Sequence, residues 1–376
     1  METALALASS IRRIRESQAM TQQQLAELAG LPAAQSVSDI ELQRREVKAF
    51  ELARIARALH TPVEELLGLI TSPAERVLWR RAGTGRNPLI EAKLLERARR
   101  FALLERWCDL PPAEPLPDWE LDPTTATRTE AENFAVRATR ILELGSRPTS
   151  ALLRILEERF GVKVFYEPMG EDGSAASVRG QFGSAMLINA NEAPWRRNFN
   201  VAHELFHLLT WTSVDKKLAA DGPDAPWCEE IEKLANVFAS RLLLPADPLL
   251  SEFGARLHDS KIKYLDIVEL AREFDVSSSA LVWRLVSLGR LHPDDAELLL
   301  DNAIFRAIDR GTMAERWGDT PHSLPDRFVR LAHLAYQKRR ISRAKLAEFL
   351  ETSLSELDPG LEIEGAGAAE AVVLTA

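Results

Sequence analysis

The sequence feature that most limits the fold is His203-Glu204-Leu205-Phe206-His207, which lies within a run of apolar residues. Histidines four positions apart lie on one face of an α-helix, one turn above the other. From ordinary residue frequencies, this pattern arises by chance in a chain of this length roughly once in a hundred. It therefore predicts a buried helix that carries two metal ligands.

The chemistry expected of this pattern depends on zinc. Two imidazoles in this arrangement bind one zinc ion at about 2.0–2.1 Å. Glu204 is offset from His203 by about 100° around the helix, so it reaches a water on the metal without ligating the metal. Zinc lowers the pKa of that water, and the carboxylate takes its proton. The alternative is a buried helix whose histidines are only hydrogen-bonded; two of the seven histidines in this spacing argue against it.

A zinc peptidase needs a third protein ligand and leaves a fourth position for water. One known arrangement adds a histidine in the longer pattern H-E-x-x-H-x-x-G-x-x-H. Here Thr210 and Ser213 stand at the positions that need glycine and histidine, so this class of peptidase is excluded. The other arrangement takes a glutamate from a following helix.

Residues 229–243 have the period of such a helix. Its apolar stripe consists of Ile231, Leu234, Ala235, Phe238 and Leu242. Beside the stripe lie Glu232, which we predict as the third metal ligand, and Asn236, which we predict to orient an imidazole. Glu229 shares their face and is the second candidate for the ligand, whereas Glu230 is expected in solvent.

Composition restricts the class of protein. The 376 residues suffice for two or three domains, and two cysteines imply no disulfide framework. Cys228 is interpreted as a small apolar residue, with a thiolate ligand as the alternative. The first apolar residues precede the basic ones, which excludes a signal peptide, and no run of about 18 apolar residues occurs. We therefore expect a cytoplasmic protein outside the membrane, with no general nucleic-acid footprint at a net charge of −9.

Helical segments joined by sharp turns are predicted over residues 10–68. Thr21 starts a second helix that ends at Gly30, and a short turn leads into a third segment at 35–41. This arrangement is typical of a helix-turn-helix, whose third element enters the major groove of double-stranded DNA. A small helical docking module is the alternative, because acidic and basic residues roughly balance in this region.

The residues predicted to contact DNA are polar or basic. They are Gln35, Ser36 and Ser38 for base edges, Arg44, Arg45 and Lys48 for phosphates, and Gln22 as a further contact. Helix-turn-helix modules commonly bind paired half-sites as dimers, which leaves a homodimer open. Four histidines without ligand spacing are interpreted as surface or capping residues: His258, His292, His322 and His333.

Two segments resemble known families. Residues 10–68 resemble the Xre/Cro-type helix-turn-helix of phage repressors. Residues 125–250 resemble the ImmA/IrrE family of metallopeptidases. The motifs that carry this resemblance are the strand 186–189, the lead-in 196–200, the histidine helix and the spaced residues from Glu232 to Pro245.

The second resemblance implies a zincin-like core that cleaves a repressor protein in response to a signal, often DNA damage or mobile-element induction. It assigns the same three metal ligands and the same base as the spacing does. The family usually has glycine where this chain has Phe206, which narrows the space behind the metal. It often has methionine where this chain has Leu244.

The expected fold class is α+β and predominantly helical, with a small sheet. The predicted segments are a helix-turn-helix domain at 1–69, a helical linker at 70–124, a zincin-like domain at 125–257, a helical region at 258–358 and a disordered tail at 359–376. Within the zincin-like domain, a helix over 150–160 precedes strands at 162–166 and 180–189.

The leading hypothesis is a DNA-associated regulatory zinc endopeptidase that hydrolyses a peptide bond in a repressor or antitoxin-like protein under stress. The alternative is an Xre-family regulator or antitoxin whose zinc site is structural or sensory, which a fourth protein ligand such as Cys228 would favour. A variant of the leading hypothesis is self-cleavage at the proline-rich stretch 111–117.

Overall fold

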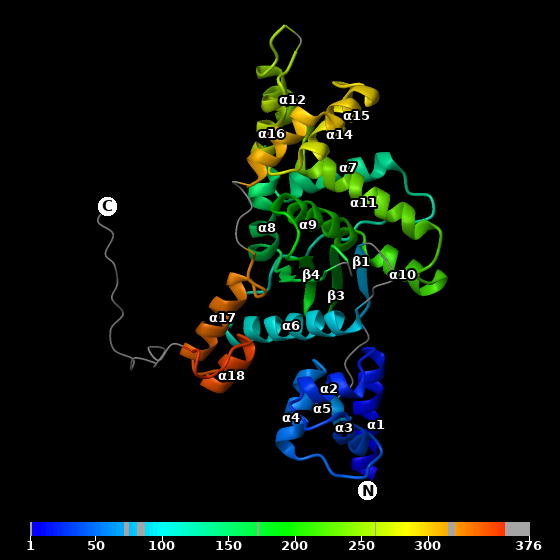
Figure 1. The fold of residues 1–376 in the computed structure, drawn as a ribbon, viewed down its shortest axis with the longest axis vertical. Coiled ribbons are helices and arrows are strands. Elements are labelled where there is room, and N and C mark those ends of the chain that lie inside the picture. The colour runs from blue at the N-terminus through cyan, green and yellow to red at the C-terminus, as the bar shows by residue number, and fades with distance from the viewer. Residues whose placement is uncertain are drawn as a thin grey trace, which may run out of the picture.

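The computed structural model describes residues 2–70, 75–80, 87–170, 173–259, 261–314 and 320–357. Figure 1 shows N-terminal helices at one end of the molecule, a central domain around a sheet, and further helices at the other end. The predicted disordered tail at 359–376 lies outside the described residues. No helix within the described ranges is long and apolar enough to cross a membrane.

The N-terminal part consists of α1 (Glu2–Ser17), α2 (Gln22–Leu28), α3 (Ala34–Glu41), α4 (Ala49–Ala58) and α5 (Val63–Leu66). Thr21 caps α2 through its hydroxyl, and Oε1 of Gln24 accepts a hydrogen bond from the Thr21 amide. These helices bury an apolar core of their own. Its most deeply buried members include Leu25, Val37, Ile40, Ile55 and Leu59.

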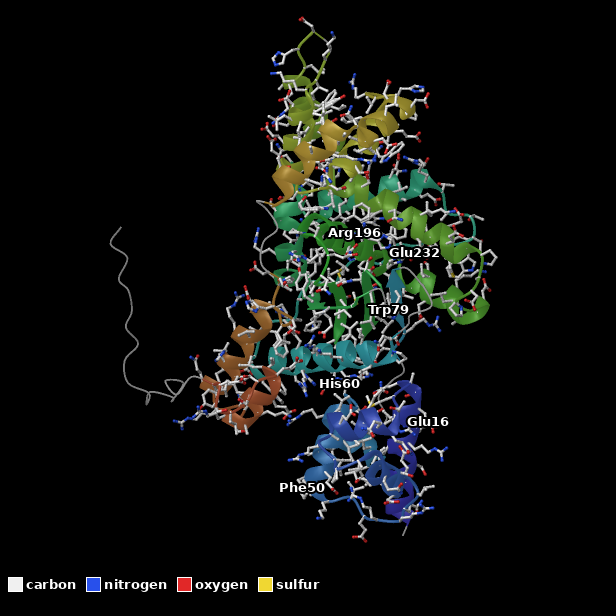
Figure 2. All side chains as sticks on the ribbon, in the orientation of Figure 1. Glu16, Phe50, His60, Trp79, Arg196 and Glu232 are labelled. Atoms are coloured by element: carbon white, nitrogen blue, oxygen red, sulfur yellow. The ribbon has the colours of Figure 1, made fainter. Side chains whose placement is uncertain are left out.

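A buried ion pair joins α1 to α3. Arg15 donates from Nε to Oε1 of Glu41 at 2.6 Å and from Nη2 to Oε2 at 3.0 Å. The N-terminal helices meet the central domain at the start of the next long helix, where Leu89 packs against their core. At this junction Nδ1 of His60, labelled in Figure 2, lies 2.6 Å from Oε2 of Glu96.

A four-stranded sheet in the order β1-β3-β4-β2 forms the centre of the molecule. Its strands are β1 (Val77–Arg80), β2 (Lys163–Glu167), β3 (Ala175–Gly180) and β4 (Gly183–Asn189). β2 runs parallel to β4, while β3 is antiparallel to both β4 and β1. The β3–β4 hairpin turns into Gly183, whose φ of +93° favours glycine.

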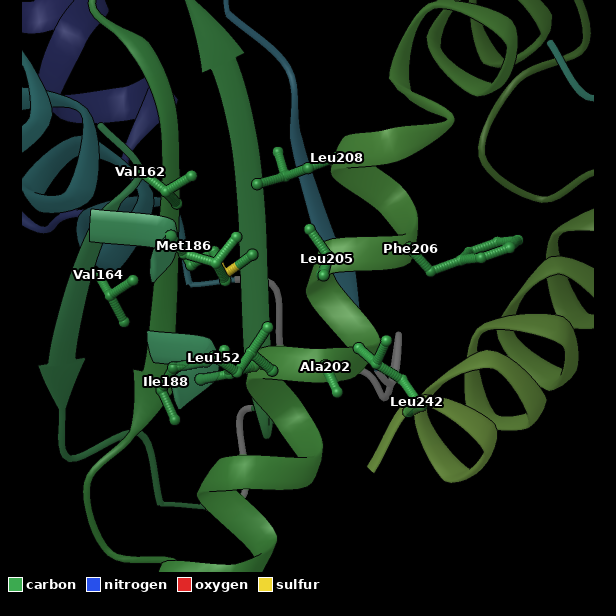
Figure 3. Packing of buried hydrophobic residues seen from close by; sticks show 14 of the residues in the cluster. Leu152, Val162, Val164, Met186, Ile188, Ala202, Leu205, Phe206, Leu208 and Leu242 are labelled. Carbon is green, nitrogen blue, oxygen red and sulfur yellow. The ribbon is translucent and has the colours of Figure 1, made fainter. Parts of the chain in front are cut away.

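The helices around the sheet are α6 (Pro88–Trp107), α7 (Arg128–Ile141), α8 (Pro148–Glu158), α9 (Pro194–Leu209) and α11 (Trp227–Leu243). α9 packs against β3 and β4, and Figure 3 shows its Leu205 and Leu208 on the side that faces Met186 of β4. α11 packs against α9 and α7, and α8 contacts both α9 and α11. α6 contacts β2 and β4 and runs across the strands in Figure 1. The sheet and these helices share one apolar core.

The remaining helices are α10 (Trp211–Asp221), α12 (Ala246–Ala255), α13 (Tyr264–Glu273), α14 (Ser278–Ser287), α15 (Pro293–Asp301), α16 (Ala303–Ala314), α17 (Asp326–Gln337) and α18 (Arg343–Phe349). α13 packs against α14 and α16, and α14 contacts α11. α17 packs against α6 and α18, so the last helices return to the central domain.

The predicted fold class, α+β and predominantly helical with a small sheet, is confirmed. The helix expected at 150–160 and the strands expected at 162–166 and 180–189 correspond to α8, β2 and β4. β1 and β3 were not predicted from the sequence. In the segment 70–124, expected to be a helical linker, the structure has the edge strand β1 as well as α6.

Candidate metal centre

The helix that carries the histidines, α9, is buried along its second half. Pro194 begins its first turn, and every residue from Asn200 to Leu209 is buried. A helix without a solvent-exposed face must satisfy its polar side chains inside the protein. The partners come from α11, which packs beside it.

Three side chains converge between α9 and α11: His203, His207 and Glu232, the last labelled in Figure 2. The Nε2 atoms of the two histidines are 3.2 Å apart. Oε2 of Glu232 lies 3.2 Å from Nε2 of His203, and Oε1 of Glu232 lies 3.1 Å from Nε2 of His207. The structure therefore brings together the two histidines of α9 and the glutamate predicted as their partner.

The spacing of these atoms fits a bound metal ion. Ligand atoms at about 2.0–2.1 Å from a tetrahedral metal ion lie about 3.3 Å from one another. Two imidazole nitrogens and a carboxylate form a donor set that suits zinc. Over the part of the chain that the structure describes, this is the one cluster of histidine, cysteine and acidic side chains with metal-binding spacing.

Asn236 fixes the orientation of the first histidine. Its Oδ1 lies 3.1 Å from Nδ1 of His203. An amide oxygen only accepts hydrogen bonds, so Nδ1 of His203 carries the proton and its Nε2 presents a lone pair to the cluster. Asn236 follows Glu232 by one turn of α11, which puts both side chains on the face toward α9.

The cluster meets solvent on the side of Glu232. The side chains of His203 and His207 are 0% and 4% exposed, whereas that of Glu232 is 33% exposed. Burial raises the pKa of the Glu232 carboxyl, but attraction to His207 and hydrogen bonds with both histidines outweigh it, and the pKa falls well below its ordinary value. Glu232 is therefore ionised, which is the form that ligates a metal ion.

Glu204 lies beside the cluster and is fully buried. Successive residues of a helix are about 100° apart around its axis, so Glu204 does not share the face of the two histidines. Its carboxylate oxygens are not among the converging ligand atoms. This position suits a group that exchanges a proton with a molecule bound at the cluster.

Phe206 fills the space behind the second histidine. Its ring centroid lies 5.8 Å from that of His207 and 5.5 Å from that of Phe238 on α11. Both phenylalanine side chains are fully buried. The aromatic side chain therefore packs between the two helices and restricts the imidazole of His207.

The other acidic residues at the start of α11 point to solvent. The side chain of Glu229, the second candidate for the third ligand, is 79% exposed and lies 3.2 Å from Lys233. Glu230 pairs with the same lysine at 2.9 Å and is 64% exposed. Cys228 is partly buried and lies outside the converging cluster. Of the histidines without ligand spacing, His292 caps α15 through Nδ1.

Three of the residues predicted to contact DNA lie on α3. Gln35 is exposed and donates to Oδ1 of Asp39 at 2.8 Å, while Ser36 and Ser38 are half-buried. Their side chains lie on the helix that follows the turn after α2, which is the position of a recognition helix in a helix-turn-helix.

Of the remaining residues predicted to contact DNA, some form hydrogen bonds within the domain and others are exposed. Gln22 donates to Oε2 of Glu41 at 2.8 Å. Arg45 donates through both terminal nitrogens to Glu51, at 2.9 and 3.1 Å. Its guanidinium is therefore paired with a carboxylate of the same domain. Arg44 and Lys48 are exposed.

One buried positioning residue, Asn200, has no role in the sequence analysis. Its Nδ2 donates to the carbonyl oxygen of Ser174 at 3.0 Å and to the carboxylate of Glu192. Oγ of Ser174 donates to the same carboxylate at 2.8 Å. This network joins the start of β3 to α9, one turn before the histidines. Its signal in the sequence is an amide within a buried, mostly apolar helix.

Two family models match the chain. One, a peptidase family described as the IrrE N-terminal-like domain, matches residues 157–286, which include α9 and α11 and therefore all three converging side chains. The other model, a helix-turn-helix, matches residues 11–66. Both resemblances stated from the sequence are confirmed.

The curated proteins similar to this chain include two named radiation response metalloprotease IrrE. That of Deinococcus deserti is 30% identical over 170 residues, and that of Deinococcus radiodurans is 27% identical over 168 residues. Each match covers 43% of this chain, and the two cover 55% and 47% of the relatives. The chain thus spans about half the length of the curated relatives that it matches.

Among solved structures, a Mycobacterium tuberculosis transcriptional regulator is similar to this chain at 17% sequence identity and a TM-score of 0.31. The similarity covers 50% of this chain and 51% of that chain.

Proposed function

We propose that this protein is a DNA-associated regulatory zinc endopeptidase. His203, His207 and Glu232 hold the zinc ion, and Glu204 is the catalytic base. The observation that carries the proposal is the convergence of two Nε2 atoms and a carboxylate at 3.1–3.2 Å from one another, between α9 and α11 and open to solvent on the side of Glu232. The match of residues 157–286 to a peptidase family supports it.

A zinc ion at this cluster would supply a water of lowered pKa and polarise the carbonyl of the bond to be cut. Glu204 takes the proton from the attacking water and returns it to the nitrogen that leaves. Asn236 keeps the proton of His203 on Nδ1, so that Nε2 remains a ligand. The burial of α9 holds these groups in fixed positions, which lowers the cost of orienting them during the reaction.

The number of protein ligands favours catalysis over a purely structural site. Structural zinc sites are closed by four protein ligands, whereas catalytic sites have three and leave one position open. Within the described residues, the cluster has three members, and Cys228 is not one of them. The alternative of a structural or sensory zinc site in an Xre-type regulator therefore has less support.

The N-terminal domain is proposed to bind double-stranded DNA through α3, with Gln35, Ser36 and Ser38 toward base edges and exposed basic residues toward phosphates. The helix-turn-helix match at 11–66 supports this. The proposed substrate is a repressor or antitoxin-like protein, cut in response to DNA damage or mobile-element induction. The names of the two curated relatives, radiation response metalloproteases, agree with a stress-dependent role.

Comparing cells that carry the wild-type chain with cells that carry Glu204→Gln tests the proposed function. After DNA damage, we expect new protein N-termini within a transcriptional regulator in wild-type cells and their absence with Glu204→Gln, because loss of a general base lowers the rate by about 10²–10⁴. Identical sets of N-termini in both strains would contradict the proposal. A new N-terminus within the exposed stretch 111–115 of this chain would instead identify self-cleavage.

A further inference from the structure

The first strand of the sheet covers an edge that the IrrE-like domain leaves open. The matched residues 157–286 contain β2, β3 and β4. In the order β1-β3-β4-β2, β3 is the outermost of these three strands. β1 comes from outside the match, from the chain between the N-terminal helices and α6.

β3 packs against α9, the helix that carries the two histidines of the metal centre. α10 begins directly after α9. Arg76, the residue before β1, contacts Asp215 of α10. Its Nη1 donates to the Asp215 carbonyl oxygen at 3.1 Å and lies 3.3 Å from Oδ1 of the same residue. Figure 1 shows β1 on the side of the sheet where α10 lies. The start of β1 is therefore tied to α10, the helix that follows the histidine helix.

β1 pairs with β3 in the way that an added peptide pairs with a sheet. Its four residues run antiparallel to β3, from Val77 opposite Val178 to Arg80 opposite Ala175. Extended segments of other proteins add to open sheet edges through the same backbone hydrogen bonds. The Val77 side chain is buried in the shared core, and Leu78 and Trp79 are half-buried. An extended segment with an apolar residue in the place of Val77 would make equivalent contacts.

Among the described residues, polar side-chain contacts hold the segment of β1. Glu75 pairs with Arg99 at 2.6 Å, and Trp79 donates from Nε1 to Glu91 at 2.5 Å. Arg76 and its partner Asp215 are 36% and 41% exposed, and ion pairs at such exposure contribute little net stability. Of the described side chains of β1, Val77 is the one that is deeply buried, so this four-residue strand is open to exchange with another strand.

We propose that β1 is an internal occupant of the peptide-binding edge of β3, and that an extended segment of the substrate replaces it. The identity of the bound segment as a substrate rests on the proposed peptidase function. The exchange of strands itself requires no cleavage, so it is measured separately from activity.

The first test uses a fluorescent peptide with the sequence of residues 75–80 and the full-length chain carrying Glu204→Gln, which is not expected to cut the probe. Adding Val77→Asp puts a charge in the buried position of β1 and disfavours its pairing. We expect the probe to bind on the order of tenfold more tightly to this double variant, because apparent affinity scales with the fraction of open edges. The matched control Val77→Ile keeps an apolar side chain and should bind as the parent does. Equal affinity for all three, or no binding to any, contradicts the proposal.

The second test keeps β1 in place, so it does not depend on a destabilising change. Val77 and Val178 are directly opposed, and Cβ atoms of such pairs are about 4.5–5.5 Å apart, near the reach of a disulfide. In a background with Cys108 and Cys228 replaced by alanine, Val77→Cys with Val178→Cys should bind no probe when oxidised and regain binding on reduction. Equal binding in both states overturns the proposal. A chain that binds zinc but cuts no protein would refute the proposed function while leaving both binding results unchanged.

Discussion

His203 owes its orientation to two neighbours on α11. Asn236 accepts a hydrogen bond from Nδ1 of His203, and Glu232 lies beside Nε2. Nδ1 therefore carries the proton, and Nε2 faces the cluster. The same face of one helix thus supplies both a proposed ligand and the group that orients another ligand. Residues outside the ligand set are expected to matter for metal affinity for this reason.

Asn236 gives a specific expectation. Asn236→Leu removes the acceptor for Nδ1 of His203, and we expect zinc affinity to fall by about 10–100-fold. Asn236→Asp retains an acceptor oxygen and should stay near the wild-type affinity. Competition with a zinc-binding dye measures both variants. Wild-type affinity in Asn236→Leu would show that this contact does not position the imidazole.

Glu157 on α8 gives an expectation for pH. Burial raises its pKa from 4.5 to about 7, against the opposing attraction of Arg327. A carboxyl whose pKa is raised by folding favours the folded state below its unfolded pKa, and this stability is lost as pH rises through about 7. Glu157→Gln should therefore raise the free energy of unfolding by about 2 kcal/mol at pH 8 relative to wild type, allowing for its partial exposure, and change it little at pH 4.

Urea unfolding at the two pH values measures this difference for Glu157→Gln. Glu158→Gln is the matched control, because the neighbouring side chain is 53% exposed. The control should show no pH-dependent difference from wild type. A Glu157→Gln effect that is the same at pH 4 and pH 8 would contradict the account of its raised pKa.

At the scale of elements, helices were easier to predict from the sequence than strands. The residues of α9 and α11 that form the cluster follow a period of about 3.6 residues, so the shared face of Glu232 and Asn236 is visible in the sequence. β3 begins with two alanines and a serine, which lack the branched side chains typical of strands, and β1 has only four residues. Their pairing joins residues about a hundred positions apart, such as Val77 and Val178, which no local pattern reveals.

The convergence of the cluster also depends on how α9 and α11 pack together. No local sequence pattern predicts this packing. The face of Glu232 was predicted, but its distance of 3.1 Å from His207 required the structure. Both Glu229 and Glu232 lie on one face of the predicted helix, and burial separates them: Glu229 is 79% exposed at the open end of α11. The sequence therefore narrows the choice of ligand, and packing distinguishes the alternatives.

One buried guanidinium connects several elements. Arg97 on α6 is 2% exposed and donates to Glu167, at the end of β2, at 2.9 Å. It also donates to both carboxylate oxygens of Glu351, which follows α18, at 2.6 and 2.5 Å. The three residues thus tie the last helices to the sheet.

Arg97→Met should destabilise the fold by about 3 kcal/mol, because it removes the buried partner of Glu351 and leaves Glu167 paired with Lys93. Thermal and urea unfolding of the variant measure the loss. Arg154→Met is a matched control, since Arg154 is 66% exposed and pairs with Glu158 one turn away. Equal stability of the two variants would contradict the structural role of Arg97.

At the scale of the whole molecule, the N-terminal helices and the central domain have separate apolar cores. Among the described residues, Leu89 and the pair His60 and Glu96 lie where the two parts meet. Metal binding between α9 and α11 is therefore expected to stabilise the central domain and leave the stability of the N-terminal core nearly unchanged.

Chelation of the metal tests this separation. A ligand present at a thousandfold excess over its dissociation constant stabilises the folded state by about 4 kcal/mol. After treatment with a chelator, we expect faster amide hydrogen exchange in peptides from α9 and α11, and unchanged exchange in peptides from α2 and α3. The full-length chain is labelled and then digested, and mass spectrometry of the peptides measures the exchange in each region. A uniform change along the chain, or none, would contradict the expectation.

The central claim is that His203, His207 and Glu232 together hold one zinc ion, and the zinc content of the purified chain tests it most directly. We predict close to one equivalent for the wild type and for Glu229→Gln, whose side chain points to solvent, and far less for Glu232→Gln. A wild type without zinc, or a Glu232→Gln variant that retains a full equivalent, would contradict the claim.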